Sequence, residues 1–101
     1  GDVIGTPVGK TAASVKAQAP VVADNLVAAI QEVELPSAWN GYTSCPLITE
    51  KGQAMLVEFD FSLEMTPSFD FLNPFEPQWA PWFLKERMIH AAYNAMLRGR
   101  V

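Results

Sequence analysis

The 101-residue chain has little of several features that usually mark a function class. Its single cysteine, Cys45, excludes a disulfide scaffold and a four-thiolate zinc site. No apolar run approaches the roughly 18 to 20 residues that span a bilayer, so no membrane-spanning helix is expected. The net charge is −4, which argues against nucleic acid as a partner, because phosphate binding needs a clustered basic surface.

The beginning of the chain lacks two further features. Gly1-Asp2 has no methionine before it, and the next residues have neither the charged nor the apolar half of a signal peptide. We therefore expect a segment of a longer polypeptide. Half of the residues are apolar (50%), so this segment can bury a core and is not expected to be disordered.

The first third of the chain, from Thr6 to about Val33, predicts a well-buried helix. Thr11 can cap the first turn through its hydroxyl, and apolar residues follow at three- and four-residue spacing. Pro20 lies inside this stretch. Because proline has no backbone N–H, it removes the hydrogen bond to the Lys16 carbonyl, and we expect a kink or a break there.

Two lysines, Lys10 and Lys16, lie near the start of this helix, where the helix dipole favours an acidic residue. Beside Gly9, these lysines and the free first-turn amides form an end that can accept an anion, such as a phosphate or the charge that develops on a bound ring. The alternative, which composition alone favours, is a solvated lysine on an exposed turn.

A linker over residues 34–42 is followed by an alternating pattern. Residues 47–49 and 54–61 predict two strands around a turn at residues 50–53, with Gly52 at a positive φ. One face of the second strand would be covered and the other partly wet. One face would carry Met55, Val57, Phe59 and Phe61. The opposite face would carry Leu56, Glu58, Asp60 and Ser62. A short third strand near residues 66–71 would lie at an edge, because Pro67 lacks an N–H.

The C-terminal quarter interleaves prolines with aromatic residues and then predicts a helix from Pro81 to about Leu97, with Gly99 as its stop. Residues 77–101 carry a local charge of +3, whereas residues 1–76 carry −7. Such a helix can lie in a membrane interface, with its rings at headgroup depth. It can equally be an ordinary amphipathic helix that packs on its own domain.

Cys45 lies in the run Tyr-Thr-Ser-Cys-Pro-Leu at residues 42–47, where the linker becomes the first strand. A lone cysteine is most often a small buried apolar residue. The functional alternative is a redox thiol, whose disulfide partner would then lie outside the chain. His90 has no metal-ligand spacing around it, and no metal site is expected. The chain as a whole predicts an α+β fold with a long N-terminal helix, a β-hairpin or small antiparallel sheet and a C-terminal amphipathic helix.

Three stretches resemble a known family. Residues 1–5 (Gly-Asp-Val-Ile-Gly) and 9–13 (Gly-Lys-Thr-Ala-Ala) are similar to the second flavin-contacting motif of flavoproteins with two dinucleotide-binding domains. Residues 42–47, the hairpin that ends at residues 57–61 and the helix that ends at residues 95–99 resemble the C-terminal region of sulfide:quinone oxidoreductase. Gly-Asp is generic to the superfamily, whereas the Tyr-Thr-Ser-Cys-Pro-Leu run is specific to this branch.

The resemblance implies a fragment of a larger α/β flavoprotein that passes electrons from sulfide, through a pair of redox cysteines and FAD, to a membrane quinone. Residues 1–34 would be the tail of the FAD-binding domain, and residues 35–101 would form a C-terminal domain. Cys45 would be one of the two redox cysteines. The residues that would contact FAD are Gly1, Asp2, Lys10 and Thr11. The candidates for contact with the quinone or the membrane are Phe71, Phe75, Trp79, Trp82 and Phe83.

The same resemblance implies peripheral attachment to a membrane, which we expect to be the bacterial cytoplasmic membrane, through residues 77–101. The segment alone lacks the partner cysteine and the other domains, so we expect it to be inactive and able to self-associate through the surface that they would cover. Two alternatives stay open. The parent protein could be a related membrane flavoprotein that oxidises NADH, or the segment could be a non-catalytic module that binds a membrane or a partner.

Overall fold

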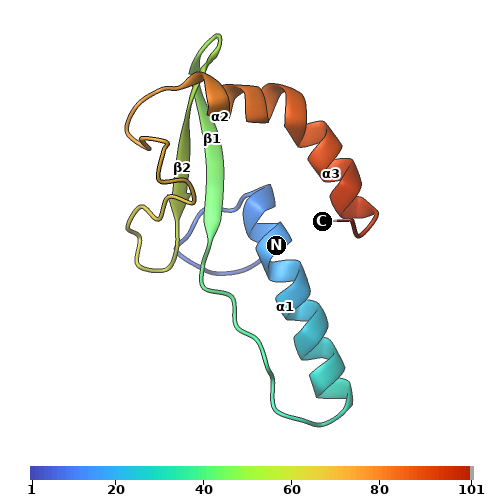
Figure 1. Cartoon of the computed structure of the whole chain (residues 1–101). Coiled ribbons are helices and arrows are strands. Elements are labelled where there is room, and N and C mark those ends of the chain that lie inside the picture. Colours follow the sequence, from blue (N-terminus) through green and yellow to red (C-terminus); the bar gives the residue numbers. More distant parts are fainter. Residues whose placement is uncertain (101) are drawn as a thin grey trace. The chain divides into compact units, whose positions relative to one another are not determined.

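The structure is a computed structural model that describes residues 1–100. A helix, α1 (Ala12–Ile30), is followed by the strands β1 (Thr43–Glu50) and β2 (Gln53–Phe59) and by three consecutive helical segments. These segments are α2 (Trp79–Phe83), the π-helical turn η1 (Leu84–Met88) and α3 (Ile89–Leu97). Figure 1 shows β1 and β2 as one hairpin, which forms a two-stranded antiparallel sheet. The predicted α+β class is confirmed.

The chain divides into two compact units. The first unit consists of Gly1–Ser44 and Glu58–Thr66, and the second consists of Cys45–Val57 and Pro67–Val101. The hairpin contributes to both, because its open end belongs to the first unit and its turn to the second. Among the described residues, the buried apolar side chains are Val8 and Ala28 in the first unit and Ala54 and Leu56 in the second.

Helix α1 starts as predicted but is far more exposed than predicted. Thr11 caps it, because the Thr11 hydroxyl oxygen accepts a hydrogen bond from the Ser14 N–H at 3.2 Å. The prediction at Pro20 was a kink or a break, and the break is wrong, because the helix continues through this residue. The prediction of a well-buried helix is also wrong: within the described helix, only Ser14, Gln18 and Ala28 are buried.

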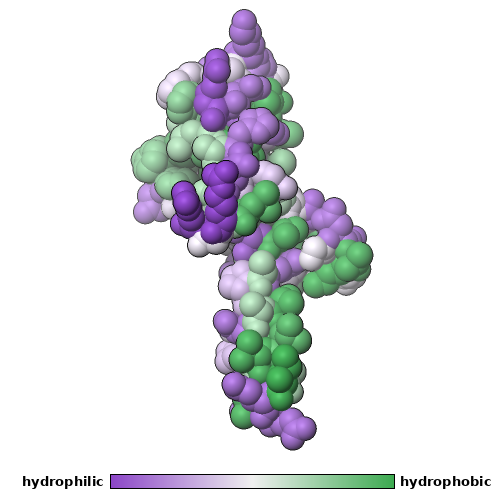
Figure 2. Space-filling view, turned by 90° about the vertical axis from the view of Figure 1, so that its right-hand side faces the viewer, coloured by the Kyte–Doolittle hydropathy of each residue, from purple (hydrophilic) through white to green (hydrophobic). Residues whose placement is uncertain are grey.

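The apolar residues in the second half of α1 are mostly solvent-accessible. The exposed fractions are 63% for Val22, 60% for Leu26, 54% for Val27 and 73% for Ile30. Figure 2 shows these apolar side chains gathered along the helix. We call this set, Val22, Leu26, Val27 and Ile30, the α1 apolar face. An exposed apolar face of this kind marks a surface that another segment or protein covers.

The linker after α1 runs back along the helix, and polar contacts hold it there. The Asn25 side-chain amide donates to the Ser37 carbonyl oxygen at 2.9 Å, and the Ser37 N–H donates back to Asn25 Oδ1 at 3.2 Å. Gly41 then has a φ of 87°, and a Cβ at this position would lie 2.5 Å from Phe61 Cγ. Glycine is therefore required where the linker passes the Phe61 ring, which also packs edge-on against Trp39 with 5.2 Å between centroids.

The hairpin agrees with the alternating pattern. Gly52 in the turn has a φ of 83°, as predicted. The covered face of β2 is the one that carries Leu56 and Glu58, while Met55 and Val57 are half-buried. The predicted third strand near residues 66–71 is wrong, since these residues form no strand and the nearest bridge, between Phe59 and Met65, is isolated. Pro67 cannot donate a ladder hydrogen bond, so pairing ends before it.

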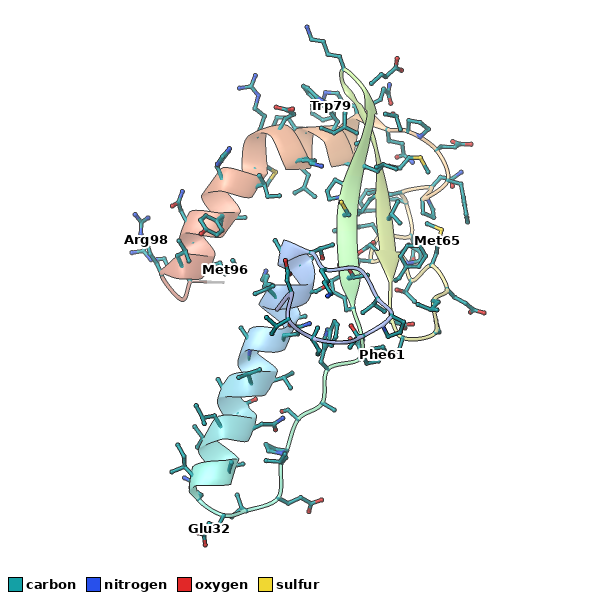
Figure 3. All side chains as sticks on the ribbon, turned by 180° about the vertical axis from the view of Figure 1, so that it is seen from behind. Glu32, Phe61, Met65, Trp79, Met96 and Arg98 are labelled. Atoms are coloured by element: carbon teal, nitrogen blue, oxygen red, sulfur yellow. The ribbon has the colours of Figure 1, made fainter. Side chains whose placement is uncertain are left out.

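The C-terminal helix forms over the predicted residues. Pro81 lies in the first turn of α2, and the chain stays helical to Leu97. Gly99 ends it with a φ of 65°, and the Arg100 N–H donates to the Ala95 carbonyl oxygen at 3.0 Å. The ribbon bends along its length (Figure 1), consistent with the π-helical turn in its middle. Trp79 and Arg98 lie at its opposite ends (Figure 3). In the described chain, no helix is both long and apolar enough to cross a membrane.

Candidate functional site

Cys45 is the third residue of β1, and its thiol is exposed. The sulfur lies 4.0 Å from the carbonyl oxygen of the next residue, Pro46. The interpretation of Cys45 as a small buried apolar residue is therefore wrong for this chain. An exposed thiol can reach a dissolved substrate or a second thiol, which a buried one cannot.

Lys85 lies close to Cys45 within the second unit. The Lys85 ammonium group donates a 2.8 Å hydrogen bond to the Pro46 carbonyl oxygen, the same oxygen that lies near the Cys45 sulfur. Lys85 is the second residue of the π-helical turn η1, a conformation that is frequent at functional sites. The sequence analysis counted Lys85 only toward the basic charge of the C-terminal segment. Its spacing from Cys45 carries no pattern that could have singled it out.

Glu58 is a second residue that the sequence analysis did not select. It is 3% exposed, and its carboxylate accepts a 2.7 Å hydrogen bond from the Tyr42 hydroxyl within the first unit. The alternation placed Glu58 on a face that could have been wet. A glutamate between Val57 and Phe59 in a strand is a weak signal of a buried carboxylate, because the same pattern occurs in half-exposed strands.

The residues predicted to contact FAD all lie in the first unit. Asp2 and Lys10 are exposed, and the amino group of Gly1 donates to the Gln18 side chain. Thr11 is engaged as the cap of α1. An open pocket of 390 Å³ lies beside the first turns of the helix, lined by Ala13, Lys16, Ala17 and Tyr42. Of the two lysines near the start of α1, Lys16 lines this pocket and Lys10 is exposed.

The aromatic candidates are in the second unit, and only two of them make a ring contact with each other. Trp79 and Phe83 stack with 4.9 Å between their centroids. Phe71 packs instead against Phe69, with 5.5 Å between centroids. Phe71 and Phe75 are 79% and 71% exposed. Trp82 is half-buried. Among the described residues, no group of side chains could hold a metal ion.

Three curated proteins that are similar to this chain carry the same name. No family model matches the chain. The chain is 36% identical, over 101 residues, to the mitochondrial sulfide:quinone oxidoreductase of Dictyostelium discoideum, covering 99% of the chain and 22% of that protein. It is 42% identical over 81 residues to the mitochondrial sulfide:quinone oxidoreductase of Schizosaccharomyces pombe, covering 80% of the chain and 18% of that protein.

A third relative is the mitochondrial sulfide:quinone oxidoreductase of Mus musculus, which is 35% identical over 101 residues, covering 98% of the chain and 22% of that protein. The chain thus spans about one fifth of the length of these curated relatives. The resemblance inferred from residues 1–13, 42–61 and 95–99 is confirmed. The chain belongs to the sulfide:quinone oxidoreductase family, as a fragment of one of its members.

Proposed function

We propose that this chain is part of an FAD-dependent enzyme that oxidises sulfide and reduces a membrane quinone, with Cys45 as one of its two redox cysteines. The observation that carries the proposal is the exposed Cys45 thiol on β1, beside a carbonyl oxygen that also binds the Lys85 ammonium group. Sulfide oxidation places negative charge on sulfur, and a neighbouring ammonium group stabilises such charge. The names of the three relatives supply the substrate pair.

In the proposed reaction, Cys45 acts with a cysteine that lies outside this chain. The sulfide sulfur would bond to one sulfur of the oxidised pair while the bond between the pair breaks, so that sulfide loses two electrons and the pair gains them. The other cysteine is released as a thiolate, and the outer sulfur of the persulfide would pass to a nucleophilic sulfur acceptor such as a second thiol. The two cysteines would then form their disulfide again as two electrons and two protons pass on to reduce the quinone. The exposed position of Cys45 on a strand allows both contacts that this requires, one with a second sulfur and one with the electron acceptor.

The residues at the start of the chain fit the chemistry that FAD needs. FAD, when bound, would accept an electron pair from sulfur and deliver it to the quinone. The first turn of the described helix α1 has no acidic residue, so Lys10, Lys16 and the helix amides offer only donors and positive charge. These groups suit the pyrimidine side of a flavin ring, where negative charge is stabilised. The exposed Asp2 carboxylate can accept hydrogen bonds from the ribityl hydroxyls of FAD. Gly1 and Thr11 would line the path by which FAD reaches these groups.

The exposed aromatic residues of the second unit suit a quinone and a membrane surface. Phe71, Phe75 and Trp79 are more than half exposed, and Phe83 stacks on Trp79. Aromatic rings and basic residues together favour the headgroup region of a bilayer. We propose peripheral attachment through residues 77–100, while Val101 lies outside the described residues. The relatives are named mitochondrial, so they give no support to the bacterial membrane expected from the sequence.

The test of this function is Cys45→Ser in the full-length enzyme. We expect the variant to lose sulfide-dependent quinone reduction and to keep its FAD, because the substitution removes one sulfur of the redox pair and leaves the chain start unchanged. A parallel assay with NADH as the electron donor separates this function from that of a nicotinamide-dependent flavoprotein. Near-normal sulfide turnover by Cys45→Ser would show that Cys45 is not a redox cysteine.

A further inference from the structure

A closed set of hydrogen bonds joins the start of α1 to the start of β1 within the first unit. The Thr43 hydroxyl donates to the Gly9 carbonyl oxygen at 3.0 Å, and its oxygen lies 3.1 Å from the Thr11 hydroxyl oxygen. The Ser14 hydroxyl donates to the same Gly9 carbonyl oxygen at 3.2 Å. Thr43 is 5% exposed and Ser14 is 2% exposed. A buried polar set whose members are all bonded holds its parts in one arrangement.

The contact between Gly9 and Thr43 leaves no room for another atom. A Cβ at residue 9 would lie 3.2 Å from Thr43 Oγ1 and 3.8 Å from Thr43 Cγ2. The first of these distances is tighter than an ordinary van der Waals contact, so the Thr43 side chain would have to give way. The turn before α1 therefore approaches β1 as closely as glycine and threonine allow.

This hydrogen-bonded set lies within the first unit, which also carries the residues proposed to face FAD. Lys10 stands between Gly9 and Thr11, both of which bond to Thr43, and Cys45 follows Thr43 by two residues on β1. Thr43 is 34 residues from Gly9 in the sequence. One buried hydroxyl thus ties the lysine-bearing turn to the strand that carries the cysteine.

We propose that Thr43 is a positioning residue for the redox site, an inference that rests on the proposed function. Its hydroxyl holds the Gly9-Lys10-Thr11 turn so that Lys10 and the amide end of α1 keep a fixed orientation toward bound FAD. Without the hydroxyl, the Gly9 carbonyl loses one donor and the Thr11 hydroxyl loses a partner, so the turn can shift. A shift of about 1 Å in a positioning group can lower a rate by as much as 100-fold.

The experiment compares Thr43→Val, which removes the hydroxyl at nearly equal volume, with Thr43→Ser, which keeps it. Both are made in the full-length enzyme. Three quantities are measured: the kcat of sulfide-dependent quinone reduction, the midpoint potential of bound FAD, and amide hydrogen exchange over residues 9–15 in the apoprotein. For Thr43→Val we expect a kcat lowered about tenfold or more, a lower flavin potential and faster exchange. For Thr43→Ser we expect values close to those of the wild type.

A second variant keeps the test decisive if Thr43→Val does not fold. Gly9→Ala disturbs the same contact from the other side, and we expect it to lower kcat and the flavin potential in the same direction. The inference is overturned if Thr43→Val, or Gly9→Ala in its place, matches an active wild type, or if Thr43→Ser is as impaired as Thr43→Val. A wild-type enzyme without sulfide-dependent activity overturns the proposed function instead. The exchange measurement on the apoprotein is independent of that activity.

Discussion

The Lys85 ammonium group donates a 2.8 Å hydrogen bond to the carbonyl oxygen of Pro46. This carbonyl group lies on β1, and its donor is a side chain of the π-helical turn η1. The bond fastens the C-terminal helix to the strand of Cys45 within the second unit. It also places the Lys85 ammonium group on the carbonyl oxygen that lies 4.0 Å from the Cys45 sulfur.

We expect Lys85→Met to lower the free energy of unfolding by about 1 kcal/mol, because a charged hydrogen bond to a partly buried carbonyl is lost while most of the side-chain volume stays. Urea denaturation of the full-length protein measures the change. Arg87→Met is the matched control, since Arg87 is an exposed cation in the same turn. Equal effects of the two substitutions would mean that the bond from Lys85 to Pro46 adds nothing to stability.

The basic end of the C-terminal helix predicts a charge-dependent membrane affinity. Each basic residue near an anionic surface contributes about 1 kcal/mol, so Arg98→Gln combined with Arg100→Gln should weaken binding to anionic vesicles by roughly 30-fold. Co-sedimentation with anionic and neutral vesicles measures this. The control is Lys16→Gln combined with Lys51→Gln, which removes the same charge elsewhere in the chain. Equal losses in both double variants would argue against attachment through the helix end.

The isolated chain should self-associate through the α1 apolar face. Replacing Leu26 and Ile30, which are 60% and 73% exposed, with glutamine removes apolar surface that an association would bury. We expect a dissociation constant at least about tenfold higher, because burial of one such side chain contributes about 1.5–3 kcal/mol. Sedimentation velocity measures it. Val3→Gln is the control, since Val3 is fully exposed but lies outside α1. An unchanged constant in the α1 variant would rule out this face as the contact.

Hydrogen bonds from the Ser62 side chain and then from its backbone hold the pKa of Asp60 below its ordinary value of 3.8. The Ser62 N–H lies 2.8 Å from Asp60 Oδ1. Because the folded-state pKa is depressed, the resulting stability is present above the unfolded-state pKa and is lost as the pH falls through the folded-state pKa. Ser62→Ala should therefore raise the pKa of Asp60 toward 3.8, with part of the shift kept by the backbone bond. An NMR titration would show this rise, which Ser37→Ala should not produce; an unmoved Asp60 in Ser62→Ala would contradict it.

Local features could be predicted from the sequence because neighbouring residues determine them. Thr11 caps α1, Gly52 turns the hairpin at a positive φ, and Gly99 ends the C-terminal helix, all as expected. The predicted third strand does not form around Pro67, although the sequence already showed that this residue has no N–H for strand pairing. The helix did not break at Pro20, and α1 continues from Ala12 to Ile30.

Properties that depend on distant residues could not be predicted. The stretch from Thr6 to about Val33 has the composition of a buried helix, yet most apolar side chains in the second half of α1 are exposed, because burial depends on residues distant in the sequence. The alternation in β2 showed that two faces differ, but not that the face with Glu58 would be the covered one. That outcome depends on the Tyr42 hydroxyl, which reaches the carboxylate from 16 residues away.

The single cysteine, the Tyr-Thr-Ser-Cys-Pro-Leu run and the order of helix, hairpin and helix were determined by the sequence alone, and with them the family. The tertiary structure decided that the thiol is exposed, that Lys85 meets the carbonyl beside it, and that Thr43 bonds to Gly9 and Thr11. The physical reason is separation along the chain. Caps and turns form between residues a few positions apart, whereas these contacts join residues 32 to 39 positions apart and exist only once the chain has folded back on itself.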